Sequence, residues 1–189
     1  QHRLAQMYYY GNRVEPDYEE AATYYRLAAE QGIASAQTTL GYMLNQGQGV
    51  ETDHSEAFRW FNEAIQQDDE RAMFNLAGML LDGVGVPVDV DEGILWMEKA
   101  AESGLEEAQV NLGALYANGE KVPRDYSKTL GWYLRAAENN STLAQSNLSK
   151  MYRYGQGTEI NLPYALMWAT LSAAHGRTES WGLAAELRS

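Results

Sequence analysis

The residue types that most often carry out chemistry are sparse in this 189-residue chain and poorly spaced for it. The three histidines, His2, His54 and His175, lie far apart, and none belongs to an HExxH pattern, which binds zinc by placing two imidazoles on one helix face. The absence of cysteine excludes thiolate metal sites and disulfides. We therefore expect surface positions for the histidines and predict no metal site and no cofactor.

Two stretches resemble ligand-binding loops but lack residues that such loops need. Gly47 and Gly49 follow a helical pattern rather than a strand, and neither a third glycine nor a GK[ST] sequence accompanies them, so they predict a turn and not a phosphate loop. Asp89, Asp91 and Glu92 crowd together without the further oxygen ligands and the glycine of an EF-hand loop. The chain is therefore predicted not to be an enzyme.

The elements that position every side chain come from an internal repeat of 36 residues, which no insertion interrupts. One apolar column reads Leu4, Leu40, Leu76, Leu112 and Leu148. A glycine column reads Gly11, Gly47, Gly83, Gly119 and Gly155, and a polar column reads Asp17, Asp53, Asp89, Asp125 and Asn161. Such copies predict stacked helical hairpins, since one hairpin cannot bury its apolar faces without neighbours.

The second copy shows what each half of a repeat does. Apolar residues at helical spacing from Ala36 to Leu44 predict a first helix, and Gly47 is predicted to end it with a positive φ. A small residue beside the leucine column predicts close helix packing; this column reads Ala5, Gly41, Ala77, Gly113 and Ser149. This position of the first helix is therefore expected to serve packing.

The second helix is expected to begin after an aspartate N-cap. Asp53 with Glu56 three residues later predicts a capping box, and the same pattern recurs as Asp17 with Glu20 and as Asp89 with Glu92. Ala57, Trp60, Phe61 and Ala64 are predicted to be buried. The helix is predicted to end near Gly32, Gly104 and Gly176, or at Asp68 and Asn140 in the copies without that glycine.

One aromatic column of the second helices reads Tyr24, Trp60, Trp96, Trp132 and Trp168. Its strict register favours core packing over a platform for a cofactor or a glycan.

The repeats resemble those of the Sel-one-like repeat family, relatives of the tetratricopeptide arrays. The resemblance covers the whole chain and rests on strings such as AQTTLGYMLNQGQGVETDHSEAFRWFNEA and on AAEQG and AAESG at the hairpin ends. It implies an all-α fold, a right-handed α-solenoid of antiparallel helix pairs in which first helices line a concave groove. It also implies a role as an adaptor or scaffold, in bacteria often in signalling, envelope or host-contact functions.

We expect one repeat domain over residues 1–189. Its five tandem repeats are expected at about 1–32, 33–68, 69–104, 105–140 and 141–176, followed by a partial sixth helix over 177–189. Because the chain opens inside a first helix and the sixth copy is partial, we expect a segment of a longer protein.

If the family geometry holds, partner-binding residues are the first-helix positions that differ between copies. The candidates are Tyr9, Tyr10, Thr39, Tyr42, Asn45, Asn75, Asp82, Asn111, Asn118, Asn147, Arg153 and Tyr154. The tyrosines favour contact with a protein, because tyrosine is enriched at binding hot spots. The asparagines either bond the backbone of an extended peptide or bond locally, as asparagine readily does.

The charge of the chain limits its partners. Its net charge of −12 argues against nucleic acid and against anionic membrane surfaces, and no apolar run predicts membrane insertion. Residues 1 to 107 carry 6 basic and 20 acidic side chains, whereas residues 108 to 189 carry 8 and 6. The acidic part either steers a basic protein or peptide partner or serves only as a solvated surface.

Two other functions remain open at this stage. The array could regulate or sense a ligand for an enzyme outside this segment, or the tyrosine-rich first copy could bind a glycan. A bacterial periplasmic or secreted location is weakly favoured over the cytoplasm, and the oligomeric state is not predicted.

Overall fold

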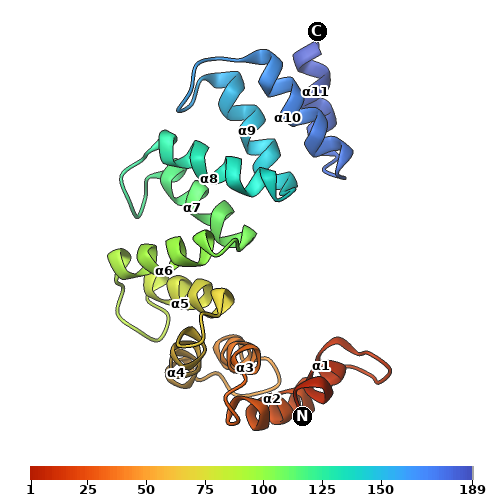
Figure 1. Ribbon diagram of the computed structural model, residues 1–189, viewed down its shortest axis with the longest axis vertical. Coiled ribbons are helices and arrows are strands. Elements are labelled where there is room, and N and C mark those ends of the chain that lie inside the picture. The colour runs from red at the N-terminus through yellow and green to blue at the C-terminus, as the bar shows by residue number, and fades with distance from the viewer. Residues whose placement is uncertain (189) are drawn as a thin grey trace. The chain divides into compact units, whose positions relative to one another are not determined.

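The computed structural model describes residues 1–188, and all regular secondary structure in this range is helical (Figure 1). The eleven helices found there are α1 (His2–Tyr10), α2 (Tyr18–Ala29), α3 (Ala34–Gln46), α4 (His54–Ile65), α5 (Glu70–Asp82), α6 (Val90–Glu102), α7 (Glu106–Asn118), α8 (Tyr126–Glu138), α9 (Thr142–Tyr154), α10 (Leu162–Ala174) and α11 (Glu179–Arg188). Each repeat supplies two of them, and α11 is the expected first helix of a sixth copy.

The chain forms two compact units, Gln1–Ala100 and the part from Ala101 onward. In the first unit α1 packs on α2, α2 on α3, α3 on α4 and α4 on α5. In the second unit the same succession runs from α7 to α11, and Figure 1 shows α9, α10 and α11 side by side. From α1 to α5 and from α7 to α11, each helix therefore packs against the next one along the chain.

The predicted N-caps are present, but the capping box forms only by half. The side chains of Asp17, Asp53, Asp89, Asp125 and Asn161 each accept a hydrogen bond from the backbone N–H three residues later. The N–H of Asp53, which Glu56 was predicted to bind, instead donates to the Leu44 carbonyl over 3.1 Å. The predicted hydrogen bond from the Asp53 N–H to the Glu56 side chain was wrong, because the first helix supplies the acceptor for that N–H. Glu56 instead accepts hydrogen bonds from Arg26 and Trp60.

The helix ends follow the prediction. The five glycines that end the first helices all have φ between 67° and 71°, and their N–H groups bond back into the helix. Asp68 and Asn140, which replace glycine after the second helices, also have positive φ, 58° and 66°. Asparagine and aspartate tolerate this region better than other side chains do, so the turn survives their presence.

The core of each repeat forms where a small first-helix residue meets a second-helix ring. A Cβ atom added to Gly41 would lie 2.8 Å from the Phe61 ring, and one added to Gly113 would lie 2.4 Å from the Tyr133 ring. Phe61 and Tyr133 are buried, as is the apolar stripe from Ala36 to Leu44. The predicted packing role of the small column is confirmed.

The predicted aromatic core column is buried at one position only. Trp60 is buried, whereas Tyr24, Trp96, Trp132 and Trp168 are half-buried. The buried side chains stand one residue later, at Tyr25, Phe61, Met97, Tyr133 and Ala169. The half-buried tryptophans lie at the edge of the core, and cations of the chain cover three rings of the column: Arg59 over Trp60, Lys99 over Trp96 and Arg135 over Trp132.

Buried glutamines join successive copies and were not anticipated from the sequence. Gln145 is fully buried; its Nε2 donates to the Ala137 carbonyl over 3.3 Å, and its Oε1 lies 3.3 Å from Nδ1 of His175. Two other buried glutamines make the same pair of bonds. Gln37 donates to the Ala29 carbonyl and accepts from Gln67, and Gln109 donates to the Ala101 carbonyl and accepts from Asn139. Each glutamine side chain thus links the end of the preceding repeat to the end of the repeat to which it belongs.

Candidate functional site

The candidate partner-binding residues all lie on the first helices α1, α3, α5, α7 and α9. Tyr10, Tyr42, Asp82, Asn111, Asn118 and Tyr154 are exposed, and Tyr9, Thr39, Asn45, Asn75, Asn147 and Arg153 are half-buried. The structure gathers the tyrosines of the first two copies in one place and gives several of the other candidates partners within the protein.

Tyr9, Tyr10, Tyr18 and Tyr42 form the tyrosine cluster of the first unit. The Tyr9 ring stands edge-on to Tyr10 and Tyr18, with ring centres 4.9 and 5.5 Å apart, and its hydroxyl donates to Oε1 of Gln48 over 3.1 Å. Tyr10 is 64% exposed, and Tyr18 and Tyr42 are each 40% exposed. Tyr9 therefore anchors a set of aromatic side chains that solvent reaches.

The electrostatics of the cluster follow from its crowding. Burial raises the pKa of the Tyr9 hydroxyl, and the neighbouring Tyr42, Tyr10 and Tyr18 raise it further, while the hydrogen bond to Gln48 opposes the shift. Residues 1–100 carry 17 acidic and 6 basic side chains, so this unit has a net negative charge. The cluster therefore presents aromatic rings on a negatively charged unit.

Below the cluster, Tyr25 is buried and makes the unit sensitive to alkali. Burial raises its pKa to about 12, and a hydrogen bond between its hydroxyl and Thr39 offsets only part of that shift. An unfolded tyrosine has a pKa of about 10, so the stabilisation from neutral Tyr25 is complete below pH 10 and is lost as pH rises toward 12, by about 1.4 kcal/mol for each pH unit.

We expect Tyr25→Phe to lower the free energy of unfolding by about 1 kcal/mol at pH 8, since the hydrogen bond is lost. At pH 11.5 the variant should be more stable than the unmodified chain, because phenylalanine has no proton to release. Urea unfolding at both pH values measures this. A difference between the two proteins that stays constant with pH would contradict the assignment.

Asn75, Asn111 and Asn147 occupy one register position of the repeat, and two of them are engaged within the protein. The Nδ2 of Asn75 donates to the Arg71 carbonyl in its own helix over 2.9 Å. Asn147 hydrogen-bonds Tyr133, which lowers the pKa of that tyrosine against the larger, opposite effect of burial. Binding of a peptide backbone by these asparagines remains a prediction, and at Asn75 the local bond already uses one of the two Nδ2 hydrogens.

The histidines have structural partners. The Nδ1 of His54 lies 2.8 Å from Oδ1 of Asn45, so that candidate binding residue is already paired. His2 packs edge-on to Tyr25, and His175 contacts the buried Gln145. Across residues 1–188, no group of three histidine or carboxylate side chains is placed to hold a metal ion.

In the second unit, α11 covers part of the candidate surface. The Nη1 of Arg153 lies 2.8 Å from Oε2 of Glu186 on α11, and its guanidinium lies over the Tyr154 ring, 5.4 Å from the ring centre. Tyr154 is 61% exposed. Arg153 is therefore paired with Glu186, and Tyr154 is a single exposed ring rather than part of a cluster.

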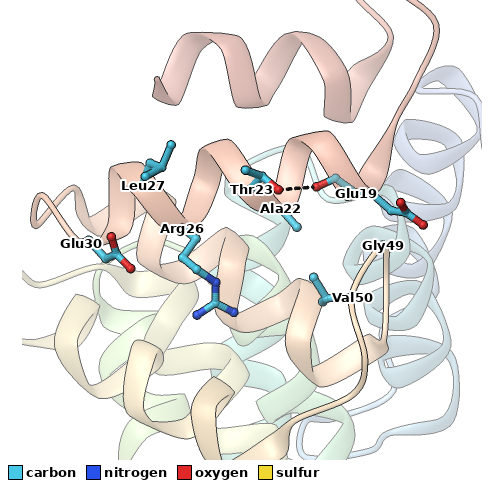
Figure 2. A pocket seen from close by; sticks show the side chains of 8 residues that line it. All are labelled: Glu19, Ala22, Thr23, Arg26, Leu27, Glu30, Gly49 and Val50. Atoms are coloured by element: carbon cyan, nitrogen blue, oxygen red, sulfur yellow. Dashed lines mark hydrogen bonds between the residues drawn. The ribbon is translucent and has the colours of Figure 1, made fainter.

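A shallow hollow of about 330 Å³ lies on another surface, along α2 (Figure 2). Figure 2 shows Glu19 and Glu30 at its two ends, with the loop residues Gly49 and Val50 near the Glu19 end. Arg26, which also lines it, forms an ion pair with Glu56 on α4. None of the candidate partner-binding residues lines this hollow.

Sequence reasoning missed two members of this neighbourhood, Tyr18 and Gln48. Tyr18 was overlooked because it begins the second helix, and Gln48 because it lies in the loop. The sequence does repeat both residue types at the same register positions: Tyr126 repeats Tyr18 three copies later, and Gln156 repeats Gln48 between the loop glycines. Only the packing of α1 on α2 shows that these positions adjoin the first-helix tyrosines.

Comparison with known proteins decides what kind of repeat this is. The family pattern described as the Sel1 repeat matches residues 1–33, 34–69, 70–105, 106–141 and 142–176. The chain belongs to the Sel1 repeat family. This Sel1 repeat protein has the predicted fold class, an α-solenoid of helix pairs, and the resemblance noted from its sequence is confirmed.

Solved structures support the same assignment. A Sel1 repeat protein from Oxalobacter formigenes is 32% identical with a TM-score of 0.86, over 95% of this chain and 73% of that one. A protective antigen of uropathogenic Escherichia coli, c5321, displays an SLR fold and is 30% identical with a TM-score of 0.85, over 95% of this chain and 38% of that one. The immunity protein Pa5087 of Pseudomonas aeruginosa shares the fold at 23% identity and a TM-score of 0.60, over 93% of this chain and 67% of that one. No curated protein matches the sequence.

The family bounds the function of this chain. Sel1 repeat proteins generally mediate protein–protein interaction and are typically not catalysts. No helix within the described residues is long and apolar enough to cross a membrane.

Proposed function

We propose that this Sel1 repeat protein is a scaffold or adaptor that binds a partner protein or peptide, and that the tyrosine cluster on α1, α2 and α3 is its main contact. The exposed rings of Tyr10, Tyr18 and Tyr42 around the anchored Tyr9 carry the proposal. Tyrosine buries a large area at low cost in conformational entropy, and rings that are already packed need little further ordering.

The charge of the first unit supports a basic partner. With 17 acidic and 6 basic side chains in residues 1–100, association with a basic protein is favoured electrostatically and weakens as salt screens it. Control of an enzyme by the array is the second candidate function. Of the two we favour the scaffold, because the cluster is an open set of rings and the hollow beside Arg26 is shallow.

The test is affinity capture from an extract of the cells that produce the protein, with the intact chain as bait. We expect the double variant Tyr10→Ala, Tyr42→Ala to retain a captured partner at least about tenfold less well than the unmodified chain does. Tyr154→Ala is the matched control, because Tyr154 occupies the register position of Tyr10 four copies later and is equally exposed, at 61% against 64%.

A partner captured equally by the double variant and by the unmodified chain would show that the tyrosine cluster is not the contact. Equal loss with Tyr154→Ala would place the contact elsewhere on the first helices. Far-UV circular dichroism of each variant verifies that its helices are intact.

A further inference from the structure

The helix α10 differs from the other second helices in carrying no charged side chain along its 13 residues. The side of α10 that points away from the core consists of residues that are exposed or, at one position, half-buried. We call this side the apolar face of α10, and its members are Pro163, Tyr164, Met167, Leu171 and Ala174. A helix that is apolar on every side is normally covered on every side.

The other second helices are charged at these positions. Each of α2, α4, α6 and α8 has at least three charged residues at the five register positions that the apolar face occupies in α10. Arg59 of α4, for example, stands at the position of Met167, and Lys128 of α8 stands at the position of Tyr164. A charged outer side is the ordinary way for a surface helix to meet water, and α10 lacks it.

Packing within the second unit does not explain the apolar face. Tyr164 is 51% exposed and Met167 is 46% exposed, although α9 and α11 both pack on α10. In α4, Glu56 accepts a hydrogen bond from Nε1 of Trp60 over 3.1 Å. Tyr164 replaces that glutamate in α10, and Nε1 of Trp168 is buried without a hydrogen-bond partner among residues 1–188. A buried N–H without an acceptor is unfavourable, so the replacement does not stabilise α10 by itself.

A further repeat would not cover the apolar face either. The second copy has a neighbouring copy on each side, since α2 packs on α3 and α4 packs on α5. Arg59 and Glu63, which occupy the positions of Met167 and Leu171 in that copy, are nevertheless exposed. Neighbouring repeats therefore leave the outer side of a second helix open, and whatever covers α10 comes from outside the array.

Charge favours a second copy of the chain as the occupant. Residues 101–189 carry 9 acidic and 8 basic side chains, against 17 and 6 in residues 1–100. Contact between two first units would bring like charges together, whereas the second unit is close to neutral. The apolar face has no charge with which to select an acidic or a basic partner, but it matches an identical face. Homodimer interfaces have such apolar cores, in which methionine and aromatic residues are enriched.

We infer that the chain forms a symmetric dimer in which the apolar face of α10 packs against the same face of a second copy. A two-fold interface pairs one patch with itself and closes at two chains, so it does not extend into a filament. Met167 is near the middle of α10 and at the centre of the face, so the two copies of this residue come close together. The inference goes beyond the proposed function and does not depend on it.

Sedimentation equilibrium of the intact chain, over about a hundredfold range of concentration, measures the association. We expect the mass of two chains at the higher concentrations. Met167→Arg introduces the residue type of Arg59 and should weaken the dimer at least about tenfold, because symmetry places one unpaired charge in each half of the interface. Leu95→Arg is the matched control, since Leu95 has the same register position in α6 and is 49% exposed, and it should leave the dimer unchanged.

Cross-linking tests the position of the contact. The chain has no cysteine, so one introduced thiol reports on one site. We expect Met167→Cys to form a disulfide-linked dimer under mild oxidation at a concentration at which Leu95→Cys does not, because a disulfide requires Cα atoms within about 7 Å. Equal cross-linking of the two variants would contradict the α10 interface. Far-UV circular dichroism verifies that the helices of each variant are intact.

Three results of sedimentation would overturn the inference. They are a monomer at every concentration, equal weakening by the two arginine substitutions, and a dimer that dissociates as salt is added, since salt screens the repulsion between two chains of net charge −12 and should not weaken an apolar contact. A monomer would leave the face to a partner protein or a lipid surface. Capture that depends on Tyr10 and Tyr42 does not require the dimer, so the scaffold proposal and the dimer can fail separately.

Discussion

Alanine in place of Gly49 is expected to lower the free energy of unfolding by about 3 kcal/mol, the sum of a backbone penalty and a steric one. Gly49 has φ of +70°, where a Cβ atom is unfavourable. That Cβ would also lie 2.3 Å from the carbonyl carbon of Tyr18 and 2.4 Å from its oxygen, and backbone atoms cannot turn aside as a flexible side chain can. The loop of the second copy would have to separate from the start of α2.

The matched control is Gly32→Ala. Gly32 has φ of +81°, but an added Cβ would meet nothing within 4 Å, so only the backbone penalty of about 1 kcal/mol remains. The second unit offers the same comparison, because a Cβ at Gly157 would lie 2.3 Å from the Tyr126 oxygen and one at Gly176 would meet nothing.

Urea unfolding followed by circular dichroism measures each pair. Both the midpoint and the slope should be compared, since neighbouring repeats need not unfold together. Equal losses at Gly49 and Gly32 would show that the approach of the loop to α2 contributes nothing to stability.

Gln145→Ala is expected to lower the free energy of unfolding by about 3 kcal/mol. The side chain is fully buried, so its removal leaves a void, and the Ala137 carbonyl loses the hydrogen bond that Nε2 donates. A buried polar group without a partner and a cavity each destabilise by amounts of this order.

Gln145→Met separates the two contributions. Methionine nearly fills the space but donates no hydrogen bond, and Met73 occupies the equivalent position in the third copy, where it is buried. We expect a loss of about 1 to 2 kcal/mol, due to the unpaired carbonyl. Full stability in both variants would contradict a structural role for the amide that joins the copies.

The features that could be predicted from the sequence are those contained within one copy of the repeat. The repeat period, both helices, the aspartate N-caps and the positive φ at Gly47 are specified by residues a few positions apart. Such features depend on local hydrogen bonds and on steric limits of the backbone, which act whatever lies beyond them. The small column opposite Phe61 was also predictable, since it lies within one hairpin.

The tertiary structure decided which residue is the partner of which. The N–H of Asp53 bonds the Leu44 carbonyl instead of Glu56, and the aromatic column is half-buried at every position except Trp60, whereas the residue after it is buried in every copy. Gln145 has its partners in the hairpin ends on either side, and Tyr18 joins the first-helix tyrosines only because α1 packs on α2. These contacts connect residues that lie on different helices, so they depend on the angle and depth at which helices pack. A pattern read along one helix specifies which face is buried but not how deeply each side chain reaches into the next one.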